Sequence, residues 1–257
     1  MGDGKTLAHG YRTLQHWNQW LSHHFLGKQL LQTENKILTD ALSRHFGKHA
    51  LLLGVPYQAD LLNSSTIPCH TMIGPLILHN EKACDIESDF HHLPILTGCA
   101  DLVVLPHTLE FIDHPRQLLS EACRIVKPEG LIVIFGFNPY SAWGLRKWFA
   151  KHKVAPWSGS FIYPNKLKNW LKLADFELEM QRTDLFKLPI SNEKVYQKLN
   201  FLEKVIHFFF PRMGGIYMMV ARAKVIPLTP IKMKWTQQLS GIRISTTMPG
   251  HIARQSE

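Results

Sequence analysis

The sequence has few cysteines, and they are not arranged to hold a metal. The four cysteines of the 257-residue chain stand at positions 69, 84, 99 and 123, so no CxxC pair exists. Cysteines paired at such short spacing are typical of structural zinc sites and of redox-active disulfides. We therefore expect four reduced thiols and no bound metal.

Long apolar stretches are also missing. No run approaches the roughly 18 residues that a membrane-spanning helix needs. His9, Arg12 and His16 interrupt the N-terminal region in which a signal peptide would carry its apolar core. We expect a cytoplasmic protein with no integral membrane segment.

A glycine-rich phosphate loop is the third absence. Residues 49–53 predict a first strand, which is followed by Gly54 and then by Val-Pro-Tyr-Gln rather than by further glycines. The missing GxGxxG run argues against a nicotinamide dinucleotide. Gly54 itself permits either a tight turn or the close approach of the backbone to a ligand.

Acidic side chains are fewer than basic ones. The chain has 29 lysines and arginines against 20 aspartates and glutamates, and its net charge is +9. This excess is compatible with a polyanionic partner such as RNA or an anionic membrane surface, but an ordinary solvated surface explains it equally.

What is present divides the chain into three regions. Residues 1–46 contain two amphipathic helices, over 11–27 and 28–46, which form an N-terminal helical cap; their aromatic side chains either pack the helices together or serve a lid. Residues 47–224 hold alternating strand and helix patterns. Residues 225–257 lose this periodicity, gain prolines and basic residues, and predict a flexible basic tail.

The middle region predicts an α/β fold. Seven short apolar runs predict strands at 49–53, 69–73, 83–87, 101–105, 131–135, 176–181 and 216–223. Helical patterns lie at 114–126, 141–152, 164–173 and 193–210. Strands that are apolar on both faces and joined by a helix belong to a parallel sheet, and right-handed crossovers bring their carboxyl ends to one edge. We expect a Rossmann-like, doubly wound, mostly parallel seven-stranded sheet with its ligand at that edge.

Residues 88–137 resemble the class I S-adenosylmethionine-dependent methyltransferases. They contain an acidic residue after the third strand, Leu-Pro, the Asp-led fourth strand ADLVVLP, a helix, Lys-Pro-Glu-Gly and a fifth strand. A narrower resemblance, to an uncharacterised group of bacterial methyltransferase-domain proteins, covers nearly the whole chain through LPHTLEF, FNPYSAWGLRKW and GGIYMMVARAKVIPLTPIK. The resemblance implies methyl transfer from S-adenosylmethionine by in-line displacement. It leaves open the acceptor (small molecule, RNA or protein) and the oligomeric state.

The resemblance also implies a cofactor site. Gly54 matches the glycine near the methionine part of the cofactor. Asp89 matches the acidic residue that accepts from the adenine amine, and Phe90 lies beside the ring. Pro106 and His107 match the residues after the fourth strand that line the cofactor. A carboxylate beside an aromatic ring suits a flat base that donates from an amine.

Three residues are candidates on the acceptor side. His107 is the first candidate for a base, because a histidine titrates near neutral pH. Glu110 lies one turn further on, where it is expected to face solvent, and is the second. Asn138, after the fifth strand, is expected to be a turn residue at the edge of the sheet that can also form a hydrogen bond with the substrate.

Two departures from the family pattern support a different function. The first loop keeps only Gly54, and no acidic residue is evident after the second strand to hold the ribose hydroxyls. The alternative is a non-catalytic binding or scaffold protein on the same fold. Such a protein could associate with RNA through the basic helix at 141–152 and the basic tail.

Overall fold

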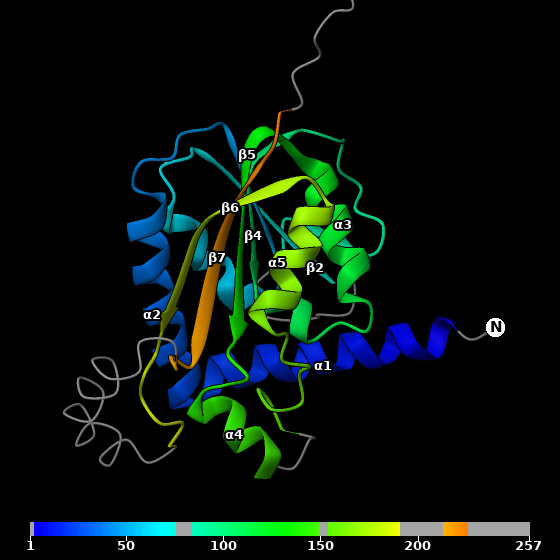
Figure 1. Ribbon diagram of the computed structural model, residues 1–257. Helices are drawn as coiled ribbons and strands as arrows, with labels where there is room; N and C mark the ends of the chain where they lie inside the picture. Colours follow the sequence, from blue (N-terminus) through cyan, green and yellow to red (C-terminus); the bar gives the residue numbers. More distant parts are fainter. Residues whose placement is uncertain (1–2, 76–83, 150–153, 191–212, 226–257) are drawn as a thin grey trace, which may run out of the picture. The chain divides into compact units, whose positions relative to one another are not determined.

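The centre of the protein is a seven-stranded, mostly parallel sheet (Figure 1). The computed structural model describes residues 3–75, 84–149, 154–190 and 213–225. The strands are β1 (His49–Leu53), β2 (Cys69–Pro75), β3 (Ile86–Ser88), β4 (Ala100–Pro106), β5 (Val126–Phe137), β6 (Phe176–Asp184) and β7 (Ile216–Ala223). Their order is β3-β2-β1-β4-β5-β7-β6; β1 to β5 are parallel, and β7 is antiparallel to both of its neighbours. The predicted sheet is thereby confirmed.

Helices cover both faces of this sheet. They are α1 (Asp3–His23), α2 (Phe25–Leu42), the 3₁₀ helices η1 (Pro56–Ser64) and η2 (Thr108–Glu110), α3 (Pro115–Ile125), α4 (Ala142–Phe149) and α5 (Pro164–Leu173). Figure 1 shows α2 on one side of the sheet and α3 with α5 on the other, while α1 crosses the end at which β4 and β5 terminate. The fold therefore places α1 at the edge where ligands of open α/β sheets bind.

The central strands are buried on both faces. Ala50 to Leu53 of β1 and Leu102 to Leu105 of β4 are at most 6% exposed. Alternate residues of a strand point to opposite faces, so a strand packed against helices on both sides must be apolar throughout. This requirement explains why these segments appear in the sequence as continuous apolar runs.

The break between the two N-terminal helices differs from the prediction. We expected it after Gly27, but it lies at His24, whose extended backbone starts α2 and whose Nδ1 accepts a hydrogen bond from Leu26 N at 3.2 Å. Gly27 is instead buried inside α2. A Cβ atom there would lie 2.8 Å from Leu21 Cα and from Trp20 O. Gly27 therefore allows α1 and α2 to cross closely rather than ending a helix.

Other boundaries differ by a few residues or lie outside the description. The third strand was expected at 83–87 and is found at Ile86–Ser88. The helix expected at 193–210 and the tail lie outside the described residues. By contacts the chain divides into two compact units, Met1–Val225 and Ile226–Glu257, and every described residue belongs to the first.

Candidate functional site

The carboxyl ends of β1, β4 and β5 are tied together by hydrogen bonds, and we call this edge the rim. The Thr108 hydroxyl donates to the carbonyl of Leu53 at 2.5 Å, which joins the end of β4 to β1. His107 N donates to the carbonyl of Phe135 at 3.1 Å, which joins β4 to β5. The backbone of His107 is left-handed, with φ of 60°. This uncommon conformation for a residue other than glycine turns the chain sharply into η2.

Gly54 lies at the β1 end of the rim beneath a buried amide side chain. Gln58, which is fully buried, accepts from Val55 N through Oε1 at 3.2 Å and donates through Nε2 to the carbonyl of Pro106 at 2.8 Å. A Cβ atom on Gly54 would lie 2.7 Å from Gln58 Oε1. Gly54 is thus required for close packing between the ends of β1 and β4, and Gln58 occupies the space beside it.

His107 is held between two carboxylates. Its Nε2 lies 2.6 Å from Oε1 of Glu34, which comes from α2, and its Nδ1 lies 2.8 Å from Oε2 of Glu110. Glu110 Oε1 accepts from Phe137 N at 2.8 Å. The three side chains are at most 1% exposed. The structure therefore brings His107 and Glu110 together and adds Glu34, a residue that the sequence analysis did not identify.

The electrostatics of this cluster favour a protonated imidazole. Burial lowers the pKa of His107, but the charge of Glu34 and the hydrogen bonds to both carboxylates outweigh burial and raise that pKa to about 9. Burial also raises the pKa of the Glu110 carboxyl, against the opposing effect of His107. At neutral pH both ring nitrogens are engaged as donors, so in this arrangement His107 cannot accept a proton.

Aromatic rings enclose the cluster. Trp17 of α1 stacks on Phe111 with ring centroids 4.6 Å apart and packs against His107 at 5.5 Å. Phe137 lies 4.1 Å from the His107 ring. Two buried polar atoms here have no hydrogen-bond partner, namely Trp17 Nε1 and Glu34 Oε2. Both N-terminal helices therefore contribute side chains that cover the rim at β4.

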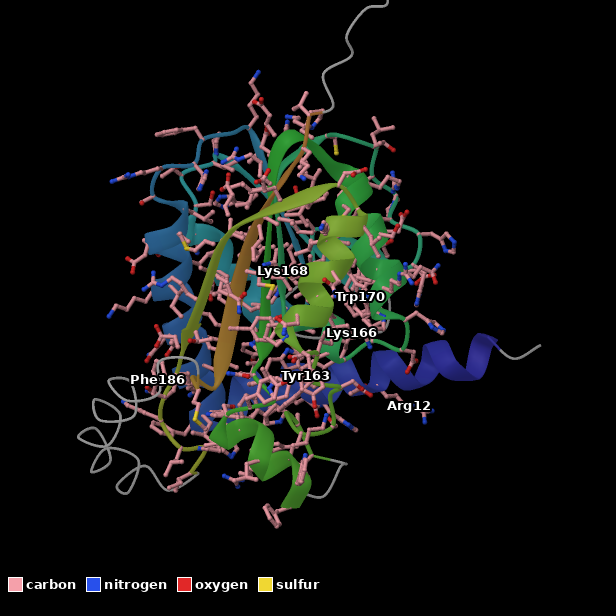
Figure 2. The ribbon with its side chains drawn as sticks, viewed as in Figure 1. Arg12, Tyr163, Lys166, Lys168, Trp170 and Phe186 are labelled. Carbon is pink, nitrogen blue, oxygen red and sulfur yellow. The ribbon has the colours of Figure 1, made fainter. Side chains whose placement is uncertain are left out.

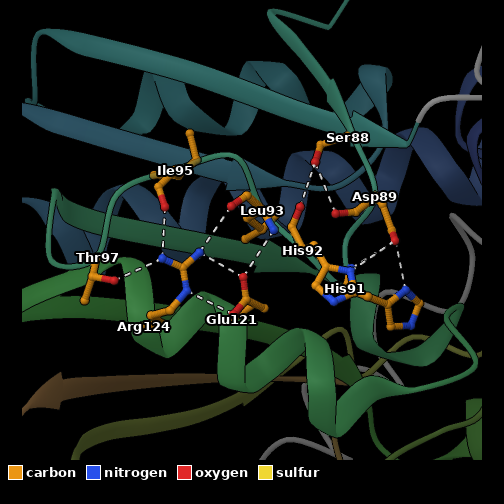
Figure 3. A network of polar contacts seen from close by, with 9 residues as sticks. All are labelled: Ser88, Asp89, His91, His92, Leu93, Ile95, Thr97, Glu121 and Arg124. Atoms are coloured by element: carbon orange, nitrogen blue, oxygen red, sulfur yellow. Dashed lines mark hydrogen bonds and ion pairs between the residues drawn. The ribbon is translucent and has the colours of Figure 1, made fainter.

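Asp89 directly follows β3 and contacts polar groups of its own loop, as Figure 3 shows. Its side chain is 35% exposed and accepts from His91 N at 3.0 Å, while the His91 ring lies 2.9 Å away. Phe90 is fully buried beside it. The loop that follows is anchored by Arg124, which donates to the carbonyls of Ile95 and Leu93. Asp89 is thus an oriented and partly exposed carboxylate.

Asn138 lies on the far side of the rim, after β5. It is 2% exposed; its Nδ2 donates to the carbonyl of Gly214 at 3.0 Å, and its Oδ1 accepts from Tyr140 N at 3.1 Å. It borders a cavity of about 640 Å³ whose described lining has no charged side chain: Asn138, Tyr140, Tyr163, Pro164, Asn165, Gln181 and Thr183. Tyr163, labelled in Figure 2, directly precedes α5, and its ring lies 5.3 Å from that of Tyr140.

Residues 74–134, which run from the end of β2 into β5, match the family described as the methyltransferase domain. This segment of the chain is therefore similar to part of a methyltransferase domain. This match includes five of the seven predicted site residues: Asp89, Phe90, Pro106, His107 and Glu110. Glu34, Gly54 and Asn138 lie outside it, so the N-terminal helices and the first loop are features of this chain beyond the matched part of the domain.

Known proteins resemble the chain over a greater length. The uncharacterised protein YafS of Escherichia coli K12 is 31% identical over 159 residues, which span 62% of this chain and 62% of that protein. A SAM-dependent methyltransferase of Thermotoga maritima superposes with a TM-score of 0.61 at 16% identity, over 84% of this chain and all of its own. A chain from the complex of the Haloferax volcanii Trm112 methyltransferase activator with a methyltransferase superposes with a TM-score of 0.56 at 14% sequence identity, over 82% of this chain and 96% of its own. The two superpositions establish the fold.

The sequence contained a signal for the residue that was missed. Glu34 stands on the apolar stripe of α2, four residues after Leu30 and three before Ile37, and all three side chains are buried. A carboxylate at such a position is rarely buried without a charged partner. The partner could not be identified from the sequence, because His107 lies 73 residues away.

Two cations of the basic helix α4 lie over aromatic rings. Arg146 of α4 lies 4.5 Å from the centre of the Trp157 ring, and Lys147 lies 4.5 Å from that of Phe161. Trp148 and Phe149 are instead more than 80% exposed. The described part of α4 is therefore an aromatic surface more than a basic one.

Metal-ligand clusters and membrane-spanning helices are both absent from the described residues. No three histidine, cysteine or acidic side chains among them converge as a set of metal ligands. None of the described helices combines the length and the apolar character that crossing a membrane requires. The four cysteines have free thiols, and burial raises the pKa of Cys123 to about 12.

Proposed function

We propose that the protein transfers a methyl group from S-adenosylmethionine to an acceptor. The observation that carries this proposal is the methyltransferase-domain match over residues 74–134. The matched segment includes Asp89, whose carboxylate is partly exposed at the same edge of the sheet. S-adenosylmethionine supplies an electrophilic methyl group on a sulfonium, and its adenine donates from an exocyclic amine. The sulfonium is a good leaving group, so the protein chiefly has to align the reactants and exclude water.

The residues at the rim fit the adenosyl part of this cofactor. Asp89 is oriented by His91 and is accessible, as an acceptor for the adenine amine must be. Phe90 packs beneath it as part of the core and supports the loop. Gly54 and Pro106, joined by Gln58, are proposed to line the methionine part. Gln58 has to move aside for that part to bind, because its amide fills the space at Gly54.

The N-terminal helices are proposed to act as a lid over the rim. Trp17 and Glu34 cover His107, and Asn18 Oδ1 of α1 accepts from Tyr57 N at 3.3 Å in the segment after Gly54. A lid in this position excludes water from the reacting groups. His107 is proposed as the base for an acceptor that arrives protonated. Its Nε2 becomes available for this role when its contact with Glu34 weakens.

The acceptor is proposed to approach from the β5 side of the rim. Asn138 borders the cavity there, and Glu110 binds Phe137 N directly before it. The uncharged described lining, with two tyrosine rings, suits a polar but neutral group on the acceptor. Small molecules, RNA bases and protein side chains all include such groups.

A second candidate function is binding without catalysis. It is favoured by Gln58, which is fully buried and already satisfies Val55 N and the carbonyl of Pro106 at the place where the methionine part would lie. A protein that keeps this bridge permanently would use the fold as a scaffold. Association with RNA would then depend on the tail, since α4 turns Arg146 and Lys147 inward.

Thermal unfolding in the presence of ligand separates the two functions. S-adenosylmethionine and S-adenosylhomocysteine at millimolar concentration are expected to raise the melting temperature by several degrees, because a ligand that binds only the folded state stabilises it. Asp89→Ala should reduce this shift. An unchanged melting temperature for the wild type with both ligands contradicts the enzyme and supports the scaffold.

A further inference from the structure

Glu34 is a buried carboxylate with one oxygen in use. Its Oε1 is bound to His107 Nε2, whereas Oε2 has no hydrogen-bond partner although the side chain is fully buried. Leaving a buried oxygen of a charged group without a donor is destabilising. Such an oxygen calls for a donor that the rest of the protein does not supply.

The charges around Glu34 favour a cation at that oxygen. The cluster contains two carboxyl groups against one imidazole. Lys147, whose charge acts on Glu110, is already bound to the carbonyl of Gly159 and lies over the Phe161 ring. The faces of Trp17 and Phe137 beside His107 are surfaces that also favour positive charge.

The first loop is tied into the fold beside this cluster. Val55 N donates to Gln58, and Gly54 N donates to the carbonyl of Ile73 at 3.1 Å. Gln58 also links this loop to Pro106, the residue before His107. The loop and Glu34 are therefore connected through the end of β4.

We propose that Glu34 binds the ammonium group of the methionine part of the cofactor through its free oxygen. This inference rests on the proposed function. The N-terminal helices would then be part of the cofactor site, and Glu34 would accept a hydrogen bond from the ammonium. The ammonium would also bring a positive charge to a cluster in which two carboxyl groups face one imidazole.

Isothermal titration with two ligands tests the proposal. S-adenosylhomocysteine has the amino-acid part, whereas 5′-methylthioadenosine shares the adenosyl and thioether groups but lacks it. In Glu34→Gln the affinity for S-adenosylhomocysteine should fall roughly 10- to 100-fold, as expected for a lost hydrogen bond to a charged group. The affinity for 5′-methylthioadenosine should stay within about twofold. Asp40→Asn likewise turns a carboxylate into an amide, at an exposed position of α2, and should alter neither affinity.

A measurement on the wild type covers the case in which Glu34→Gln does not fold. Nitrogen NMR of the His107 ring reports its pKa. An ammonium bound to Glu34 should lower that pKa by about one unit, since it weakens the attraction of Glu34 for the imidazolium. S-adenosylhomocysteine should produce this change and 5′-methylthioadenosine should not.

The outcomes separate this proposal from the proposed function. Equal losses for both ligands in Glu34→Gln, or an unchanged His107 pKa with S-adenosylhomocysteine bound, overturn the role of Glu34 and leave the methyltransferase intact. A wild type that binds neither ligand overturns both.

Discussion

The rim presents its carboxylates in two opposite ways. At β3, Asp89 is 35% exposed and bound to groups of its own loop. At β4, Glu34 and Glu110 are at most 1% exposed and hold His107 between them. Exposed pairs contribute little to folding, whereas removal of one partner from a buried pair is strongly destabilising. A substitution at the β3 end can therefore alter binding with little effect on stability. A substitution at the β4 end is expected to alter both.

The largest expected effect tests the buried end of the comparison. Glu110→Ala removes one partner of His107 and leaves Phe137 N without its acceptor. The free energy of unfolding should fall by about 3–5 kcal/mol. Urea denaturation measures this loss. Glu121→Ala, which breaks a more exposed pair with Arg124, should cost about 1 kcal/mol. Equal losses in the two variants would remove the distinction between buried and exposed carboxylates.

The pH dependence of stability is the next largest effect. His107 has its pKa raised from 6.5 to about 9 in the folded protein, so its contribution is complete below pH 6.5 and is lost as the pH rises through 9. The free energy of unfolding should fall over this range by on the order of 1–3 kcal/mol. The difference between the wild type and His107→Asn, followed by urea denaturation at each pH, isolates this contribution. Parallel pH profiles would show that His107 is not held as an imidazolium.

The smallest effect on stability is expected at the exposed end. Asp89→Asn should change the free energy of unfolding by less than about 1 kcal/mol, because the side chain is accessible and bonded locally. The same change should weaken S-adenosylhomocysteine and 5′-methylthioadenosine alike, by roughly tenfold, because both contain adenine. Calorimetry measures both affinities. A loss of affinity for only one of the two ligands would show that Asp89 does not bind the adenine.

Local patterns were enough to predict much of the fold. The bounds of β1, α5 and β7 were predicted to the residue, since each is a strong apolar or amphipathic run bordered by glycine, proline or charged residues. The start of α2 was not, because His24 takes the place of the usual capping residues. Gly27 was therefore taken as the end of the first helix, whereas it lies inside α2 and allows close packing against α1.

The site was only partly accessible to sequence reasoning. His107 and Asp89 could be named because they match positions of the methyltransferase pattern after the fourth and third strands. Glu110 was identified, but its full burial was not expected, since that depends on Phe137 N and on helices far away in the chain. Glu34 and Gln58 act through tertiary contacts whose partners no local pattern specifies.

The contact between Glu34 and His107 also has a consequence for how the chain folds during its synthesis. The two residues are 73 positions apart, so α2 leaves the ribosome well before β4 exists. Until then the helix has no histidine to pair its buried carboxylate, and its apolar stripe has no sheet to cover. Long-range contacts of this kind form late in folding. The helix pair, although made before β4, should therefore be among the last segments to reach its final place, and a chain interrupted before residue 107 would present this helix pair to chaperones.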